Sequence, residues 1–378
     1  MKNLTWQNPE QLFVAQELIN KVKSKCCGIK DYLLNIDKEK ATGLLVGNAG
    51  VSLFLYQVYR KTGQTEFEET ADIMLNNILE KQTMLSSTNF RDGLAGIGWG
   101  IEFLLQNNFY EGDPEEILED VDNVIFKSIY EARLPLLGVN EGLCGYLLYL
   151  NSRIRNKKRS NSVAHRINCE LIKVLINKID KIAPEHFQSL TKDIHFDLLW
   201  EFPALLVVLR QSLDLNLYNE KIINMVNQWM VYLGSYLPSM HCHRLSLLLA
   251  LYSINTYIHS IEMEQHIKVL AYSIDFNKLK SEVDPYAINI MHGWPGVVCL
   301  LSMASQYLNA DYPNYHLFDK TRCEILHQCL NGLEEQIDNL SKGISENKSI
   351  SIGIVNGITG IGIIDLCYPE VMSVNSNK

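Results

Sequence analysis

Residues 93–105 read GLAGIGWGIEFLL, a Gly-x-x-Gly turn that is followed directly by a long apolar run. Four other stretches have the same form: GNAG at 47–50, GLCG at 142–145, GWPG at 293–296 and GITG at 357–360. The segment after each turn is apolar nearly all round, which predicts a buried helix that begins at the turn. The repeated phrase therefore predicts a helical repeat protein.

The spacing of the turns gives the size of the repeat. Gly47, Gly93 and Gly142 follow one another at intervals of 93 − 47 = 46 and 142 − 93 = 49 residues, which leaves room for two helices and two connections. Two degenerate copies fill the interval before Gly293: EFPA at 201–204 precedes LLVVLRQSL, and HCHR at 241–244 precedes LSLLLALYSI. We therefore expect seven helical hairpins.

Between the turns lie amphipathic stretches, at 67–79, 114–129, 167–182, 218–233 and 325–340. Their apolar residues recur at steps of three and four, which is typical of half-exposed helices. An inner ring of buried helices inside an outer ring of amphipathic ones satisfies both patterns. The sequence predicts an all-α fold, an α/α toroid or barrel, as one domain over 1–378 in which a helical segment at 1–40 leads into the ring.

The glycine turns have two physical reasons in this architecture. Glycine permits positive φ and a close approach of backbones where seven turns crowd one end of the ring. The helix N-termini at that end also carry N–H groups without partners inside the helix. We expect functional residues to gather there.

Composition excludes several classes of function. A net charge of −9 argues against a nucleic-acid partner, because such proteins bind phosphates through basic patches. No apolar run reaches the roughly 18 residues of a membrane span, and no signal pattern opens the chain, so we expect a cytoplasmic protein without an integral membrane segment. The nine cysteines form no Cys-x-x-Cys pair, which argues against a disulfide framework or a zinc ribbon.

The chain resembles the lanthionine synthetase C (LanC-like) cyclases over about residues 41–366. The resemblance rests on the repeated turns and on the phrases RDGLAGIGW at 91–99, MHGWPG at 291–296 and GIVNGITGIG at 353–362. It implies an α,α-toroid that holds one zinc ion through two cysteines and one histidine. It also implies a reaction in which a peptide cysteine adds to a dehydrated Ser or Thr to form a thioether ring.

The family positions carry over only in part. His292 matches the family histidine, which makes it the candidate catalytic residue and zinc ligand, but Met291 stands where the neighbouring cysteine belongs. The second cysteine position falls on Ser239, or on Cys242 if the alignment shifts by three residues. At two other family positions, an acidic residue is replaced by Gly138 and a histidine by Trp200.

A rebuilt metal site is one hypothesis from these residues. His241 and Cys242 at the fifth turn could join His292 at the sixth, giving the sulfur and imidazole ligands that zinc accepts. His243 could be a further ligand or cap a helix. Aromatic side chains near the same end either pack in the core or line a peptide pocket together with Glu141; they are Trp99, Trp200 and Trp294.

Three functions remain open. The first is maturation of a ribosomally made precursor peptide, as a cyclase that works with a dehydratase partner. The second is a non-catalytic LanC-like scaffold that binds such a peptide. The third is an α/α-barrel carbohydrate-active enzyme, which needs two carboxylates across a cleft; Asp92 and Glu141 are the nearest pair.

Overall fold

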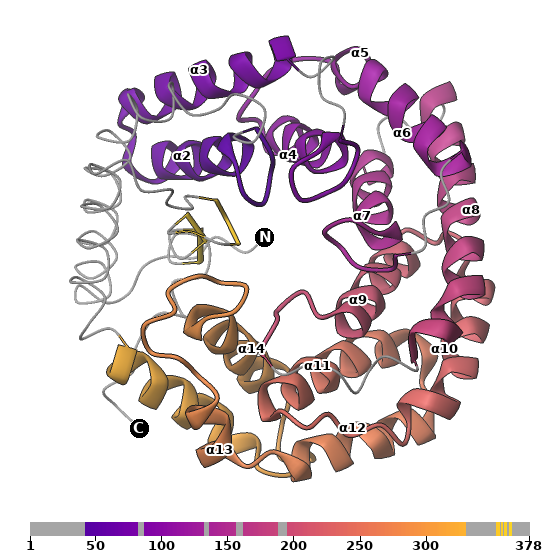
Figure 1. Cartoon of the computed structure of the whole chain (residues 1–378), viewed down its shortest axis with the longest axis vertical. Coiled ribbons are helices and arrows are strands. Elements are labelled where there is room, and N and C mark those ends of the chain that lie inside the picture. Colours follow the sequence, from indigo (N-terminus) through magenta and orange to yellow (C-terminus); the bar gives the residue numbers. More distant parts are fainter. Residues whose placement is uncertain are drawn as a thin grey trace.

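The computed structural model describes residues 42–81, 87–131, 136–155, 162–187, 195–329 and, near the end of the chain, 353–355, 357, 359–360 and 363–364. These residues form a ring of paired helices (Figure 1). The predicted segment at 1–40 and most of the predicted helix at 325–340 lie outside the described residues. That residues 1–378 make a single domain stays a prediction.

The inner ring consists of the helices that follow the predicted turns (Figure 1). In chain order they are α2 (Asn48–Thr62), α4 (Leu94–Gln106), α7 (Leu143–Ile154), α9 (Glu201–Asp214), α11 (His241–Ile258) and α14 (Trp294–Tyr307). The prediction of buried inner helices is confirmed. In α11, the consecutive Leu247, Leu248 and Leu249 are 0%, 0% and 5% exposed. Three consecutive helical residues point in three directions, so this helix is surrounded by other elements.

The outer ring consists of α3 (Thr65–Lys81), α5 (Pro114–Ile117), α6 (Glu119–Glu131), α8 (Val163–His186), α10 (Asn219–Leu233), α12 (Ile261–Ser273), α13 (Phe276–Ser281) and a helix over 315–329. The alternation of inner and outer helices confirms the α/α toroid. The amphipathic pattern did not single out α12. Its solvent face carries Ile261, Val269 and Tyr272, which are 54–78% exposed and blur the division between polar and apolar faces.

The glycines of the turns are required by close approach of the backbone. The expectation of positive φ is wrong for the first glycine of the turn, because φ is −108° at Gly93 and −107° at Gly293, where the chain is extended. At the second glycine the space is already occupied. A Cβ on Gly96 would lie 2.0 Å from the carbonyl oxygen of Phe90, far inside van der Waals contact.

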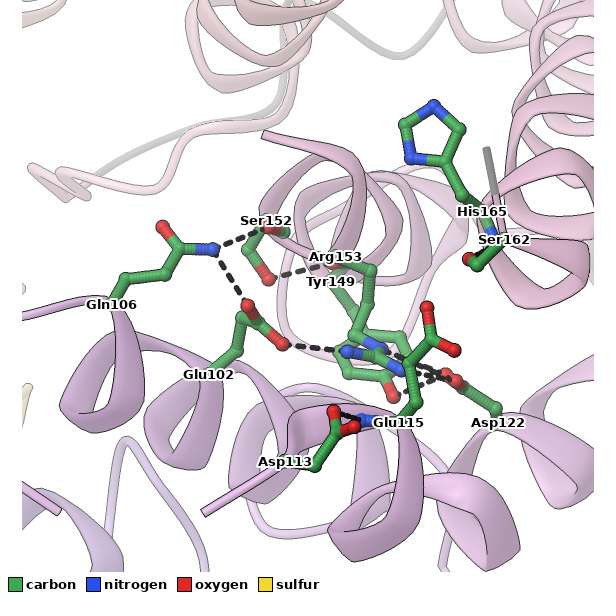
Figure 2. Close-up of polar contacts among 10 residues, drawn as sticks. All are labelled: Glu102, Gln106, Asp113, Glu115, Asp122, Tyr149, Ser152, Arg153, Ser162 and His165. Atoms are coloured by element: carbon green, nitrogen blue, oxygen red, sulfur yellow. Dashed lines mark hydrogen bonds and ion pairs between the residues drawn. The ribbon is translucent and has the colours of Figure 1, made fainter. Parts of the chain in front are cut away.

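A buried ion cluster ties α4 and α7 to outer helix α6 (Figure 2). Arg153 binds the carboxylates of Glu102 and Asp122 at 2.6 Å each, and its own side chain is 3% exposed. The Tyr149 hydroxyl donates to Asp122 at 2.5 Å, and Gln106 donates to Glu102 at 2.7 Å. Burial and the Asp122 carboxylate raise the pKa of Tyr149 well above its usual value, so the hydroxyl keeps the proton that it donates.

Within the described part of the chain, no helix combines the length and the apolar character that crossing a membrane requires.

Candidate functional site at the turns

The turns before the inner helices are joined to one another by backbone hydrogen bonds. The Val355 N–H donates to the Leu45 carbonyl at 3.0 Å, and the Leu45 N–H donates to the Arg91 carbonyl at 2.9 Å. The Arg91 N–H in turn donates to the Asn140 carbonyl at 3.1 Å. The seventh, first, second and third turns therefore form a continuous belt, and the bond between Val355 and Leu45 closes the ring.

The fourth turn continues the belt through a backbone hydrogen bond to the sixth turn. Residues 195–200, which we call the fourth-turn segment, precede α9. In this segment the Leu198 N–H donates to the Met291 carbonyl of the sixth turn at 2.8 Å, and the Met291 N–H donates to the Val355 carbonyl at 3.2 Å. The link to the third turn comes from a side chain, since Glu201 accepts a hydrogen bond from the Leu137 N–H at 3.1 Å. In Figure 1 the fourth-turn segment reaches from α9 toward the start of α14.

Two histidines bind the fourth-turn segment at one peptide group. His292 Nδ1 lies 2.9 Å from the Phe196 carbonyl oxygen. His243 Nε2, from the first turn of α11, accepts a hydrogen bond from the Asp197 N–H at 3.2 Å. The Phe196 carbonyl and the Asp197 N–H belong to the same peptide unit. That unit is therefore held at both ends by imidazoles from two different repeats.

These contacts define which nitrogen of each neutral ring carries the proton. A carbonyl oxygen only accepts, so Nδ1 of His292 carries a proton and the Nε2 of its neutral ring carries a lone pair. An N–H only donates, so Nε2 of His243 is unprotonated. His292 is an exposed residue, and its Nε2 makes no hydrogen bond to any described residue. The site therefore presents a basic nitrogen of His292 at the turn end of the ring.

His243 is enclosed, in contrast to His292. It is 2% exposed, and its ring stacks on Trp200 with centroids 4.7 Å apart. The Phe196 ring lies 6.1 Å away. Sequence reasoning treated His243 only as a spare ligand or a helix cap. Its partner, Asp197, is 46 residues away in the chain, so no local sequence pattern could predict the contact.

The fifth turn is built around a carboxylate from the segment after α13. Glu282 accepts hydrogen bonds from the N–H groups of His241 and Cys242 at 2.8 and 2.9 Å, which satisfies two donors at the start of α11. Where other repeats have their second glycine, Arg244 donates from Nε to the Pro238 carbonyl at 2.7 Å. Two side chains, Glu282 and Arg244, therefore hold this turn.

Two of the three predicted zinc ligands, Cys242 and His241, are engaged elsewhere. The Cys242 thiol is 0% exposed and faces the Leu279 carbonyl at 4.0 Å, while His241 Nδ1 accepts from the Asp275 N–H at 3.1 Å. Burial and the Glu282 carboxylate raise the pKa of Cys242 well above its usual value, which opposes the thiolate that zinc needs. Burial and Arg244 lower the pKa of His241.

No group of three or more His, Cys, Asp or Glu side chains among the described residues is arranged to hold a metal ion. The structure does not bring His241, Cys242 and His292 together as one ligand set, and Met291 packs in the core at 9% exposed. These donors do not fit the zinc ion that the resemblance implies, so we derive no step through a metal.

The predicted pocket residues differ in exposure. Trp294 is 0% exposed and Trp200 is 6% exposed, so both belong to the packed core around the turns. Trp99 is half-buried and stacks on Phe103 with centroids 5.6 Å apart. Glu141 is exposed in the third turn. Of this predicted set, Glu141 and part of Trp99 have surface that a ligand could contact, while the role of all four stays a prediction.

Comparison with known proteins agrees with this architecture. Residues 38–196 match the sequence model of a family described as lanthionine synthetase C-like protein. Among solved structures the chain is similar to nisin cyclase, with a TM-score of 0.61 and 16% identity over 93% of this chain and 94% of that chain. No curated protein matches the sequence. Residues 38–196 therefore resemble the lanthionine synthetase C-like family, and the chain as a whole shares its fold with nisin cyclase.

Proposed function

We propose that this protein acts in lanthipeptide-type maturation by binding a dehydrated precursor peptide at the turn end of its ring, with His292 as the group that exchanges a proton with it. The observation that carries the proposal is that His292 is an exposed residue of the turns whose Nε2 makes no hydrogen bond to any described residue. The similarity to a protein named nisin cyclase, over nearly the whole chain, supports a modified peptide as the ligand.

The chemistry available to His292 is transfer of one proton. Its Nε2 lone pair accepts the proton of a peptide cysteine thiol, and the thiolate sulfur adds to the β-carbon of a dehydroalanine. One carbon–sulfur bond forms as the carbon–carbon double bond becomes single. The proton then passes to the α-carbon, so the product has the same mass as the starting peptide and no oxidant is needed.

A second function, peptide binding without catalysis, is favoured by a specific observation. Two family positions are filled by buried apolar side chains: Met291 and Trp200 are 9% and 6% exposed. Side chains packed in the core cannot contact a peptide as a ligand or acid would. A scaffold that holds the dehydrated peptide for a separate dehydratase or cyclase would need the binding surface and no proton transfer.

The experiment uses synthetic peptides that carry one dehydroalanine and one cysteine at several spacings. Binding is measured by fluorescence polarisation of labelled peptide, and ring formation by the loss of the iodoacetamide adduct in the mass spectrum. Ring formation that is lost in His292→Ala and kept in the exposed control His316→Ala supports the cyclase. Binding alone, equal in both variants, supports the scaffold. A protein that neither binds nor cyclises any of these peptides contradicts the proposal.

A further inference from the structure

We infer that His243 is a positioning residue for His292: it holds the Phe196–Asp197 peptide so that the peptide carbonyl keeps the His292 ring as its Nδ1–H tautomer, with Nε2 unprotonated and exposed. The use of that nitrogen on a peptide rests on the proposed function above. The positioning itself does not, and it can be measured in the protein alone.

The first step of the argument is the shared peptide group. His243 accepts from the Asp197 N–H at 3.2 Å, and His292 donates to the Phe196 carbonyl at 2.9 Å. Donation by the N–H of an amide strengthens the acceptor at its carbonyl, because the two ends polarise one another. The bond that His243 makes therefore strengthens, as well as orients, the bond that defines the His292 tautomer.

The second step is that His243 is itself held firmly. It lies in the first turn of α11, whose N–H groups at His241 and Cys242 are bound by the Glu282 carboxylate. Its ring is 2% exposed and stacks on Trp200. A side chain that is already ordered loses little rotamer entropy when it accepts this hydrogen bond, so the bond can hold the loop in position. For an exposed, mobile side chain, the entropy cost would offset the free energy of the hydrogen bond.

The third step separates positioning from folding. The fourth-turn segment has other attachments to the sixth turn. The Leu198 N–H donates to the Met291 carbonyl at 2.8 Å, and the Phe196 ring packs against Gly296, where an added Cβ would lie 3.2 Å from it. The Asp197 carboxylate accepts from the Leu199 N–H at 2.8 Å. Loss of the His243 acceptor alone should therefore leave the fourth-turn segment in place and let the Phe196–Asp197 peptide change its orientation.

The chain offers a matched pair of variants. His243→Phe keeps an aromatic ring against Trp200 and removes the acceptor. His243→Gln removes the ring stack and keeps an acceptor oxygen at a reach close to that of Nε2. A role in packing predicts that Phe is the milder change, and a role in positioning predicts that Gln is the milder change. His316→Phe, exposed on the helix over 315–329, is the control.

The readout is the nitrogen spectrum of the histidine rings in the full chain, labelled with ring-15N histidine, at a pH about one unit above the ordinary histidine pKa of roughly 6.5. The His292 signals are assigned from their loss in His292→Gln. We expect wild type and His316→Phe to show an unprotonated Nε2 at His292. We expect His243→Phe to shift His292 toward the Nε2–H tautomer, and His243→Gln to restore the wild-type pattern. Melting temperatures report folding separately.

Two results would overturn the inference. One is a wild-type His292 that carries its proton on Nε2, which needs no variant to observe. The other is a folded His243→Phe protein in which His292 keeps the wild-type tautomer. If His243→Phe does not fold, a His243→Gln protein in which His292 loses the wild-type tautomer overturns the inference instead. Failure of the proposed function would look different: the tautomer would respond as described, and no dehydrated peptide would bind or cyclise.

Discussion

His243 and His292, which lie 49 positions apart in the sequence, bind opposite ends of the Phe196–Asp197 peptide. One ring is buried and accepts, and the other is exposed and donates. This arrangement joins the fourth, fifth and sixth repeats at one point. It also decides which nitrogen of His292 is available to a ligand.

Gly96→Ala should destabilise the ring, because the new Cβ would lie 2.0 Å from the Phe90 carbonyl oxygen. Backbone has to move to relieve such a contact, which costs about 1–3 kcal/mol. Chemical denaturation of the variant measures the loss. Gly138→Ala is the matched control, since a Cβ there meets nothing within 4 Å. Equal stability of the two variants would contradict the close-approach argument.

Arg153→Met should lower the free energy of unfolding by about 3–5 kcal/mol, because it leaves two carboxylates, Glu102 and Asp122, without their cation in a buried site (Figure 2). Urea unfolding followed by circular dichroism checks this. Arg155→Met, two residues further along and exposed, should change stability by less than about 0.5 kcal/mol. A similar small change in both variants would mean that the cluster contributes little.

Acid should weaken the fold through His266. Burial lowers the pKa of this side chain, which is 6% exposed, so below the ordinary pKa the unfolded chain binds a proton that the folded chain excludes. Stability is therefore complete above about pH 6.5 and falls as the pH drops, by at most about 1.4 kcal/mol per pH unit for one group. In melts between about pH 7 and 5, His266→Gln should show a shallower slope than wild type. The exposed His316→Gln should keep the wild-type slope.

The Cys242 thiol should resist alkylation in the folded protein, because it is fully buried and its pKa is raised by burial and by Glu282. Iodoacetamide followed by peptide mass spectrometry should label Cys242 at least about tenfold more slowly than the half-buried Cys323, since each unit of pKa removes a factor of ten in thiolate. Both should react alike in denaturant. Rapid labelling of Cys242 in the native protein would show that the fifth turn opens.

Metal analysis tests the zinc hypothesis directly. Because His241 Nδ1 accepts from the Asp275 N–H and the Cys242 thiol is buried against the Leu279 carbonyl, we expect less than one zinc per purified chain and no change in His292→Ala or Cys242→Ala. Elemental analysis of the three proteins measures this. One zinc per chain, lost in both variants, would instead require the fifth turn to rearrange around the ion.

The sequence by itself determined the architecture. Repeated glycine turns, apolar inner segments and amphipathic outer ones are local patterns, and each follows from the chain within one repeat, as in GLAGIGWGIEFLL at 93–105. The same patterns located His292 at the turn end. The resemblance to the lanthionine synthetase C-like cyclases indicated that family residues are replaced at Met291 and Trp200, which the structure finds packed in the core.

Only the tertiary structure decided what the site contains. His241, Cys242 and His243 are consecutive in sequence, but consecutive positions on a helix face different neighbours. His241 therefore contacts Asp275, Cys242 contacts Leu279, and His243 contacts Asp197. The partner of each was 34 or more residues distant along the chain. Contacts of that kind depend on how the repeats close into a ring, which no pattern within a single repeat encodes.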